Sequence, residues 1–177
     1  LDPLLNLTFN DFIRTTEERH VRGAQALWSA CKKEDIYKKK YIGLYCVGCE
    51  QFYIETEVPD GNCPEHKRPL EQVEEENYFF RLSTYQKKIE ELIESDTLKI
   101  IPESRKNEVL SFVRRGLEDF SISRSQERAR NWGVKVPGDE SQVMYVWFDA
   151  LANYITAIGY EDHTLLFQKF WIENDRR

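Results

Sequence analysis

The chain has 177 residues, of which 41% are hydrophobic and 32% are charged, with a formal net charge of −6. This length suits one domain, or one domain with a smaller insert, and the acidic balance argues against non-specific binding to nucleic acid. A specific RNA partner that contacts a local basic patch is compatible with it. No apolar run of about 18 residues and no secretion signal occur, so the sequence predicts a cytoplasmic protein without a membrane span.

Residues 8–31 predict a short strand that leads into a helix. The strand rests on an apolar run of Phe9, Phe12 and Ile13. Thr15 and Glu18 have the spacing of a capping box at the start of the helix. Apolar residues then recur at helical spacing and predict one core-facing stripe: Val21, Ala24, Trp28 and Cys31. On this stripe, Cys31 is expected to be a small buried hydrophobic side chain.

The middle of the chain changes character at Lys38. Residues 41–59 are rich in aromatic and β-branched side chains, as strands are. The sequence PDGN at 59–62 predicts a tight turn, and residues 78–82 predict another extended piece.

Two helices are expected next. The first, at 83–95, starts at a capping box of Ser83 and Gln86, and the second follows Pro102 and ends with Gly116 at the C′ position. Apolar residues are expected to face inward on both: Leu82, Tyr85, Ile89, Leu92 and Ile93 on the first, and Val109, Leu110, Phe112 and Val113 on the second.

Strand and helix patterns return near residue 143. Val143 to Phe148 is a nearly continuous apolar run, typical of a strand that is covered on both faces in a parallel sheet. Asp149 is expected to cap a helix that Gly159 ends, with an apolar stripe of Leu151, Tyr154, Ile155 and Ile158. Strand–helix units therefore flank a different middle segment, which predicts a parallel α/β sheet interrupted by an insert.

Three of the four cysteines and one histidine form two pairs between residues 45 and 66. The spacing is Cys46-x-x-Cys49, thirteen residues, then Cys63-x-x-His66, which is the pattern of a zinc knuckle. Four ligands complete a tetrahedral zinc ion and leave no open position, so we expect a structural site rather than a catalytic one. The metal would supply folding free energy to a segment of about 40 residues, whose own core is small.

Other interpretations of this cluster exist. Three unrelated thiols and a surface histidine would give no reason for two correctly spaced pairs. A redox Cys-x-x-Cys would need neither Cys63 nor His66, and this one does not open a helix after a strand. Gly48 and Pro64 lie inside the two turns, where tight backbone geometry is expected.

Several segments occur in an order that resembles one family: DFIRTTEERH, YIGLYCVGCEQFY, DGNCPEHKRPLE, YFFRLSTY, PESRKNEVLSFV, LEDFSISRS, WGVKVPGD and VMYVWFDALANYITA. Over residues 8–171 the chain resembles bacterial methionyl-tRNA synthetases of the form with a single zinc knuckle. The resemblance implies an α/β class I catalytic domain of the Rossmann type. Residues 1–37 would end its first half, 38–141 would be a connective-peptide insert, and 142–177 would start its second half.

The resemblance also implies an activity and its site. ATP, with Mg²⁺, would activate methionine to methionyl-adenylate, and the methionyl group would pass to the 3′ end of the methionine tRNA, whose acceptor end arrives at the insert. The methionine pocket would be lined by Trp147, Ala150, Leu151 and Tyr154, with Phe120 on a mobile wall. Arg124 would face the active site, where a guanidinium binds carboxylate or phosphate. No role follows for His20, and His163 is expected to be solvated or near a helix start.

The family's ATP-binding motifs, His-Ile-Gly-His and Lys-Met-Ser-Lys-Ser, do not occur in these residues. We therefore expect a middle fragment that is inactive alone and works with the rest of its polypeptide, an N-terminal ATP-binding half and a C-terminal anticodon-binding domain. The alternatives are a free-standing zinc-knuckle module that binds RNA or protein without catalysis, and a catalytically dead homologue. The plain structural alternative is core packing for Trp147, Ala150 and Tyr154, and a surface salt bridge for Arg124.

Overall fold

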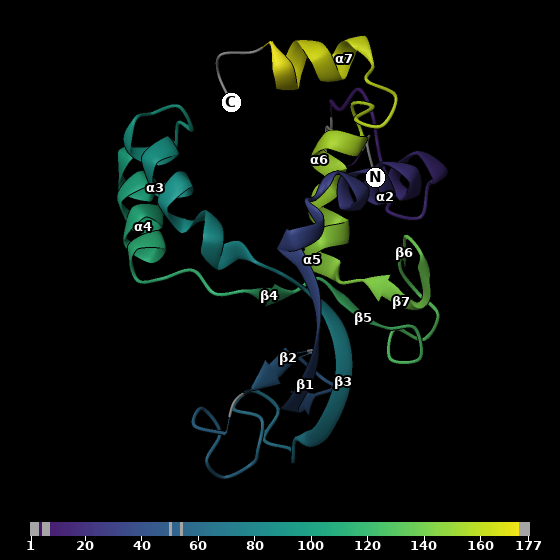
Figure 1. The fold of residues 1–177 in the computed structure, drawn as a ribbon, viewed down its shortest axis with the longest axis vertical. Coiled ribbons are helices and arrows are strands. Elements are labelled where there is room, and N and C mark those ends of the chain that lie inside the picture. The colour runs from purple at the N-terminus through teal and green to yellow at the C-terminus, as the bar shows by residue number, and fades with distance from the viewer. Residues whose placement is uncertain (1–3, 5–7, 50, 54, 174–177) are drawn as a thin grey trace.

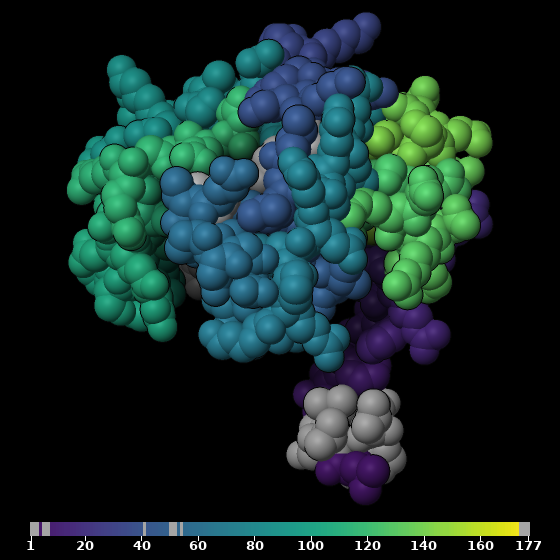
Figure 2. All heavy atoms as spheres, turned by 90° about the horizontal axis from the view of Figure 1, so that it is seen from below, coloured from purple at the N-terminus to yellow at the C-terminus, as the bar shows by residue number. Residues whose placement is uncertain are grey.

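The computed structural model describes residue 4 and residues 8–49, 51–53 and 55–173. Figure 1 shows a long strand-built extension, residues 36–80, that points away from the helices; it is called the arm below. Figure 2 views the molecule along the arm, with the arm in front of the other elements. No helix among the described residues is both long and apolar enough to cross a bilayer.

The arm is an antiparallel ribbon. β1 (Ile36–Cys46) pairs with β3 (Glu71–Phe80), starting with Ile36 opposite Phe80. Short strands extend the ribbon on both sides in the order β2-β1-β3-β4, with β2 at Gln51–Tyr53 and β4 at Phe120–Ser121. The composition of residues 41–59 thus correctly predicted strand at 41–46 and 51–53, while residues 47–49 and 55–57 form turns. The turn at 59–62 is confirmed by the bond from Gly61 N to Val58 O.

A second antiparallel sheet lies beside the base of the arm. Its order is β5-β7-β6, with β5 at Ser123–Ser125, β6 at Lys135–Val136 and β7 at Asp139–Met144. All strand pairings within the described residues are antiparallel. The expected parallel strand at Val143–Phe148 is therefore wrong: the strand ends at Met144 and a helix begins at Val146. A short apolar run does not by itself distinguish a buried strand from a buried helix, and this run is half of each.

The main core joins residues before the arm to residues after it. α2 (Glu18–Ala30) packs on a helical segment at 146–156, made of α5 (Val146–Asp149), the 3₁₀ turn η3 (Ala150–Ala152) and α6 (Asn153–Thr156). The edge of the Trp28 indole meets Phe148 at a centroid distance of 5.2 Å. The buried residues of this core are Ala24, Trp28, Ile122, Val134, Val136, Met144 and Ala152.

A helical hairpin follows the arm. A 3₁₀ turn, η2 (Leu82–Tyr85), leads into α3 (Gln86–Glu94), which packs on α4 (Glu103–Arg114) around Ile93, Leu110, Val113 and Leu117. Gly116 has φ of 113° and ends α4 as predicted. Phe112 is 60% exposed and Val109 is 36% exposed, so the prediction that they face inward was wrong. A helix packed on one side buries one stripe, and Leu110 with Val113 occupies it.

Three local predictions near helix starts are corrected. Residues 9–14 form no strand, and α2 begins at Glu18 without a side-chain cap from Thr15. Ser83 lies in η2, and its hydroxyl donates to the Asp119 carboxylate instead of capping a helix. Asp149 caps nothing, because its carboxylate is directed at His20. Ser83 and Asp149 therefore bond to partners that are distant in sequence instead of to a helix end.

The chain after residue 156 forms a short terminal helix. Gly159, with φ of 80°, ends the preceding helical segment as predicted. His163 is exposed and directly precedes Thr164, whose side chain caps α7 (Leu165–Phe167). The prediction that His163 is solvated or near a helix start is therefore confirmed. A π-helical turn, η4 (Gln168–Ile172), completes this element. Cys31 is half-buried at the end of α2, where its thiol bonds to Leu27 O.

Candidate metal centre and candidate substrate face

Two tight turns present the predicted metal ligands. β1 ends at Cys46, and the Cys49 backbone N–H bonds back to Cys46 Sγ at 3.5 Å. The second pair lies on a loop closed by Cys63 N to Arg68 O and Lys67 N to Cys63 O, both 2.8 Å, and His66 N bonds to Cys63 Sγ at 3.4 Å. Both pairs therefore adopt the same kind of turn, in which the backbone N–H of the second ligand residue donates to the sulfur of the first.

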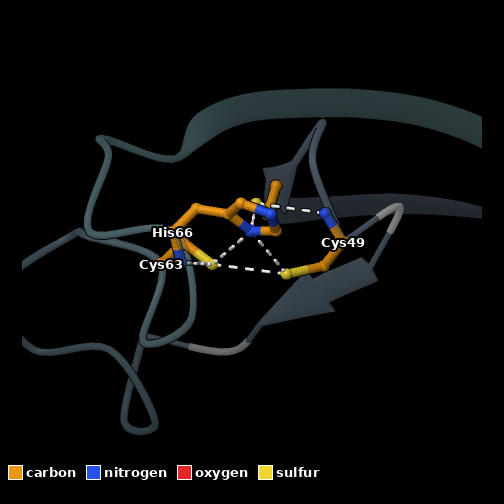
Figure 3. A group of neighbouring side chains, drawn as sticks. Cys49, Cys63 and His66 are labelled. Carbon is orange, nitrogen blue, oxygen red and sulfur yellow. Dashed lines mark hydrogen bonds between the residues drawn. The ribbon is translucent and has the colours of Figure 1, made fainter.

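The four ligand atoms converge. All of them lie within 4.8 Å of one another, and Figure 3 shows the His66 ring directed between Cys49 and Cys63. His66 Nδ1 is 3.1 Å from Cys49 Sγ, 3.6 Å from Cys46 Sγ and 3.7 Å from Cys63 Sγ. One ring nitrogen makes one good hydrogen bond, so hydrogen bonding does not explain three sulfurs around it. Tetrahedral zinc with these ligands places ligand atoms about 3.5–3.8 Å apart, and the observed separations of 3.1 to 3.7 Å are close to this.

The thiols are not disulfide-bonded. Cys49 Sγ and Cys63 Sγ are 3.4 Å apart, well beyond the roughly 2.05 Å of a disulfide. Burial opposes ionisation of Cys63, but hydrogen bonds from the backbone and side chain of His66 lower the pKa of this thiol to about 6. Three cysteine sulfurs and one imidazole nitrogen are the donor set of a structural zinc site, in which each sulfur binds as the thiolate.

Gly48 and Tyr53 support the cluster in ways that spacing does not predict. A Cβ on Gly48 would lie 2.8 Å from His66 Nε2, so the glycine leaves room for the imidazole ring. The expected reason, tight backbone geometry, is not the main one, since Gly48 does not need a positive φ. The Tyr53 hydroxyl lies 3.6 Å from Cys49 Sγ and 3.9 Å from Cys63 Sγ, where it can donate to either sulfur.

Three of the expected pocket residues share one exposed face of the 146–156 segment. Trp147, Leu151 and Tyr154 have the spacing i, i+4, i+7 and are 60%, 53% and 68% exposed. This set is called the substrate face below. Core packing, the alternative for these residues, does not describe Trp147 or Tyr154, because large buried side chains do not leave over half their surface in water.

The remaining expected site residues lie apart from that face. Arg124 and Ala150 line a cavity of about 1260 Å³ between the arm and the β5–β7 sheet. The Arg124 guanidinium is 4.9 Å from the centroid of the Tyr145 ring. Phe120 is 37% exposed on β4, beside Phe80 of the arm, and does not line this cavity. The structure therefore brings Arg124 and Ala150 to one cavity and leaves Phe120 elsewhere.

Comparison with known proteins assigns the chain to a family. A family model described as tRNA synthetases class I (M) matches residues 3–72 and 66–177. The chain belongs to this class I synthetase family. The mixed α/β class I fold and the family resemblance expected from the sequence are thereby confirmed.

Relatives of this class I chain include named methionine–tRNA ligases. The protein from Clostridium perfringens is 46% identical over 171 residues, and the one from Brucella suis biovar 1 is 49% identical over 176 residues. The match covers 95% and 97% of this chain but 26% and 34% of those proteins, so the chain spans about a quarter to a third of their length. A crystal structure of Mycobacterium tuberculosis methionyl-tRNA synthetase bound by methionyl-adenylate matches 96% of this chain and 34% of that one, with 42% identity and a TM-score of 0.80.

His20 is a residue of this synthetase chain for which the sequence suggested no role. It is fully buried, and its ring nitrogens contact Asp149 and Thr156. These partners lie 129 and 136 residues further along the chain, so no local pattern links them. The available signal was a histidine placed on the buried side of a predicted helix, which calls for a polar partner.

Proposed function

We propose that this chain is a central part of a methionine–tRNA ligase, which activates methionine with ATP and transfers it to the methionine tRNA. One observation carries the proposal: 96% of the chain superposes, at 42% identity, on an enzyme whose solved structure has methionyl-adenylate bound. An α/β fold alone supports many activities, so the weight rests on this match and on the named relatives.

The residues of the chain suit part of that chemistry. Trp147, Leu151 and Tyr154 offer a face of aromatic and aliphatic groups, which a polarizable thioether favours. Arg124 would bind the negative charge of a carboxylate or a phosphate, and the small side chain of Ala150 lines the same cavity. We propose Phe120 as a further wall that approaches only when the site closes. ATP would bind with Mg²⁺ on motifs that these residues do not contain.

We propose that the insert, residues 38–141, is a structural attachment to the catalytic residues at 1–37 and 142–177. Cys46, Cys49, Cys63 and His66 would hold a zinc ion that closes the end of the arm, with no vacant position for a substrate. The arm would contact the acceptor end of the tRNA. Reduced cysteines and tRNA charging are both consistent with work in the cytoplasm.

A chimeric enzyme tests this function. The 177 residues replace the aligned segment of the Mycobacterium tuberculosis enzyme, and methionine-dependent exchange of pyrophosphate into ATP is measured. We expect exchange with methionine and none with leucine. A chimera that is folded and contains zinc, yet shows no methionine-dependent exchange, would contradict the proposed function. The isolated 177-residue chain is the negative control, because the ATP-binding motifs are absent from it.

A further inference from the structure

A buried polar contact joins α2 to the helical segment that carries the substrate face. His20 is 0% exposed, its Nε2 lies 2.7 Å from Asp149 Oδ1, and its Nδ1 lies 2.9 Å from Thr156 Oγ1. A neutral imidazole with its proton on Nε2 donates to Asp149 and accepts the Thr156 hydroxyl at Nδ1. One tautomer thus satisfies both ring nitrogens, and the buried Asp149 carboxylate gains a donor.

Gly23 allows the two helices to approach closely at this point. A Cβ on Gly23 would overlap Cγ2 of Thr156, so any larger residue would push α6 away from α2. Gly23 lies about one turn after His20, on the same side of α2. The polar contact and the close approach therefore meet at Thr156, and together they form one attachment between the helices.

The attached segment has little regularity of its own. α5 has four residues, η3 has three and α6 has four, so the helix changes its winding twice in eleven residues. Such short turns are weakly held by backbone bonds alone, and a 3₁₀ stretch inside a helix is a common place for bending. The orientation of this segment must come from its tertiary contacts.

The attachment and the substrate face lie on opposite sides of this segment. Asp149, Ala152 and Thr156 are buried toward α2, whereas Trp147, Leu151 and Tyr154 are exposed. The two faces of a helix turn together, so a contact that fixes the back also fixes the direction of the front. Once the rotation of the segment is fixed, the side chains of the substrate face can still change direction through their rotamers.

We propose that His20 is a positioning residue: through Asp149 and Thr156 it sets the rotation of residues 146–156 and so holds the substrate face toward the methionine side chain. This inference rests on the proposed function. It makes a specific demand, since the contact reaches the methionine face and not the ATP-binding motifs. Loss of His20 should weaken the use of methionine while leaving the use of ATP unchanged.

Two amide substitutions separate the two contacts. The amide of Asn reaches about as far as Nδ1, and the amide of Gln reaches about as far as Nε2. In the active chimera, His20→Asn keeps a partner for Thr156 but loses Asp149, and we expect the KM for methionine to rise about tenfold. His20→Gln keeps the contact with Asp149 but loses the one with Thr156, so we expect a smaller rise of this KM, about threefold. The KM for ATP should be unchanged in both.

A matched control separates positioning from general destabilisation. Val113→Ala removes buried methyl groups in the α3–α4 cluster, far from the substrate face, and should lower the Tm without changing the KM for methionine. An unchanged methionine KM in His20→Asn, or a rise that ATP or Val113→Ala shares, would overturn the inference.

A third variant keeps the test decisive if His20→Asn does not fold. Thr156→Val has nearly the same shape and removes only the hydroxyl that bonds to Nδ1, so a smaller but selective rise of the methionine KM is expected, and no rise would refute the inference. Failure of the proposed function is recognised separately, because the parent chimera would then show no methionine-dependent exchange at all.

Discussion

In the arm, four ligand atoms from residues 46–66 lie within 4.8 Å of one another; in the helical core, His20 meets partners 129 and 136 residues away. The first cluster is closed by short turns that need almost nothing from the rest of the chain. The second exists only when α2 and the 146–156 segment are already packed. The ligand cluster therefore depends on local turns of the arm, whereas the His20 contacts depend on the packing of two helical segments that are far apart in the sequence.

The difference has a physical cause. Among the described residues at the tip of the arm, one small cluster of Cys46, Tyr53, Val58 and Cys63 is buried, and we expect so small a core to need a metal ion. The helical core buries a larger apolar set around Trp28 and Ile122. Loss of the metal should thus unfold the tip of the arm and leave the helical core folded.

The largest expected effect is the loss of one ligand. Cys46→Ser should reduce bound zinc from about one equivalent to near zero and unfold the tip of the arm, because an incomplete ligand set no longer binds tightly. Zinc analysis and hydrogen exchange of residues 44–70 measure this. Cys31→Ser, outside the cluster, should keep the metal. Full zinc content in Cys46→Ser would show that the ligand assignment is wrong.

The substrate face gives the next largest effect. Trp147→Ala in the chimera should raise the KM for methionine about 100-fold, because removing a large aromatic contact costs about 2–3 kcal/mol of binding. Phe112 on α4 is equally exposed, at 60%, and Phe112→Ala should leave the KM unchanged. Equal effects of the two substitutions would mean that exposure alone, and not the substrate face, governs the result.

The joint between the arm and the β5–β7 sheet should depend on pH. Asp139 accepts bonds from Lys38 at 2.8 Å and from the Tyr78 hydroxyl at 3.1 Å, and with Ser141 these hold the pKa of its carboxyl at about 2. Because this pKa is lower in the folded protein, the ionised carboxyl stabilises the fold at pH values above the unfolded pKa near 4. This stabilisation is lost as the pH falls through about 2.

Asp139→Asn should therefore cost about 2 kcal/mol of unfolding free energy at pH 7 and roughly half of that at pH 3. Urea titrations at the two pH values measure the difference. Glu140→Gln is the control, because its ion pair with Lys135 is solvent-exposed and should contribute less than about 0.5 kcal/mol. A difference that stays constant down to pH 3 would exclude Asp139 as the titrating group.

The smallest expected effect concerns the room beside His66. Gly48→Ala should weaken zinc binding about tenfold, because the new Cβ forces the imidazole to move by part of an ångström. Competition with a chromophoric chelator measures the affinity. Gly61→Ala, at φ of 67° with open space around it, should cost about 1 kcal/mol of stability and leave zinc affinity unchanged. Equal affinity in both variants would contradict the steric role of Gly48.

Sequence patterns predicted the local features well. Ligand spacing predicted which four side chains the structure brings together at the tip of the arm, because each pair is set by one turn, although their binding of zinc stays a prediction. Strand composition located most of β1 and all of β2 but reached only the last residues of β3, and glycines at 116 and 159 correctly marked helix ends. Helical spacing also gathered Trp147, Leu151 and Tyr154 on one face, although their role in methionine binding stays a prediction.

Features that depend on distant partners were missed. The run from Val143 to Phe148 was taken as one parallel strand, yet its first part pairs in an antiparallel sheet and its last part packs on Trp28 as a helix. Asp149 was expected to cap a helix, because nothing near it in sequence reveals His20. Gly48 was assigned to backbone geometry, since its real neighbour is an imidazole 18 residues away.

Methionine-dependent exchange of pyrophosphate into ATP tests the central claim most directly, measured side by side for the chimera with the Mycobacterium tuberculosis enzyme and for the isolated chain. The account predicts exchange by the chimera with methionine, none with leucine, and none by the isolated 177 residues. A folded, zinc-containing chimera without exchange, or an isolated chain with exchange, would contradict it.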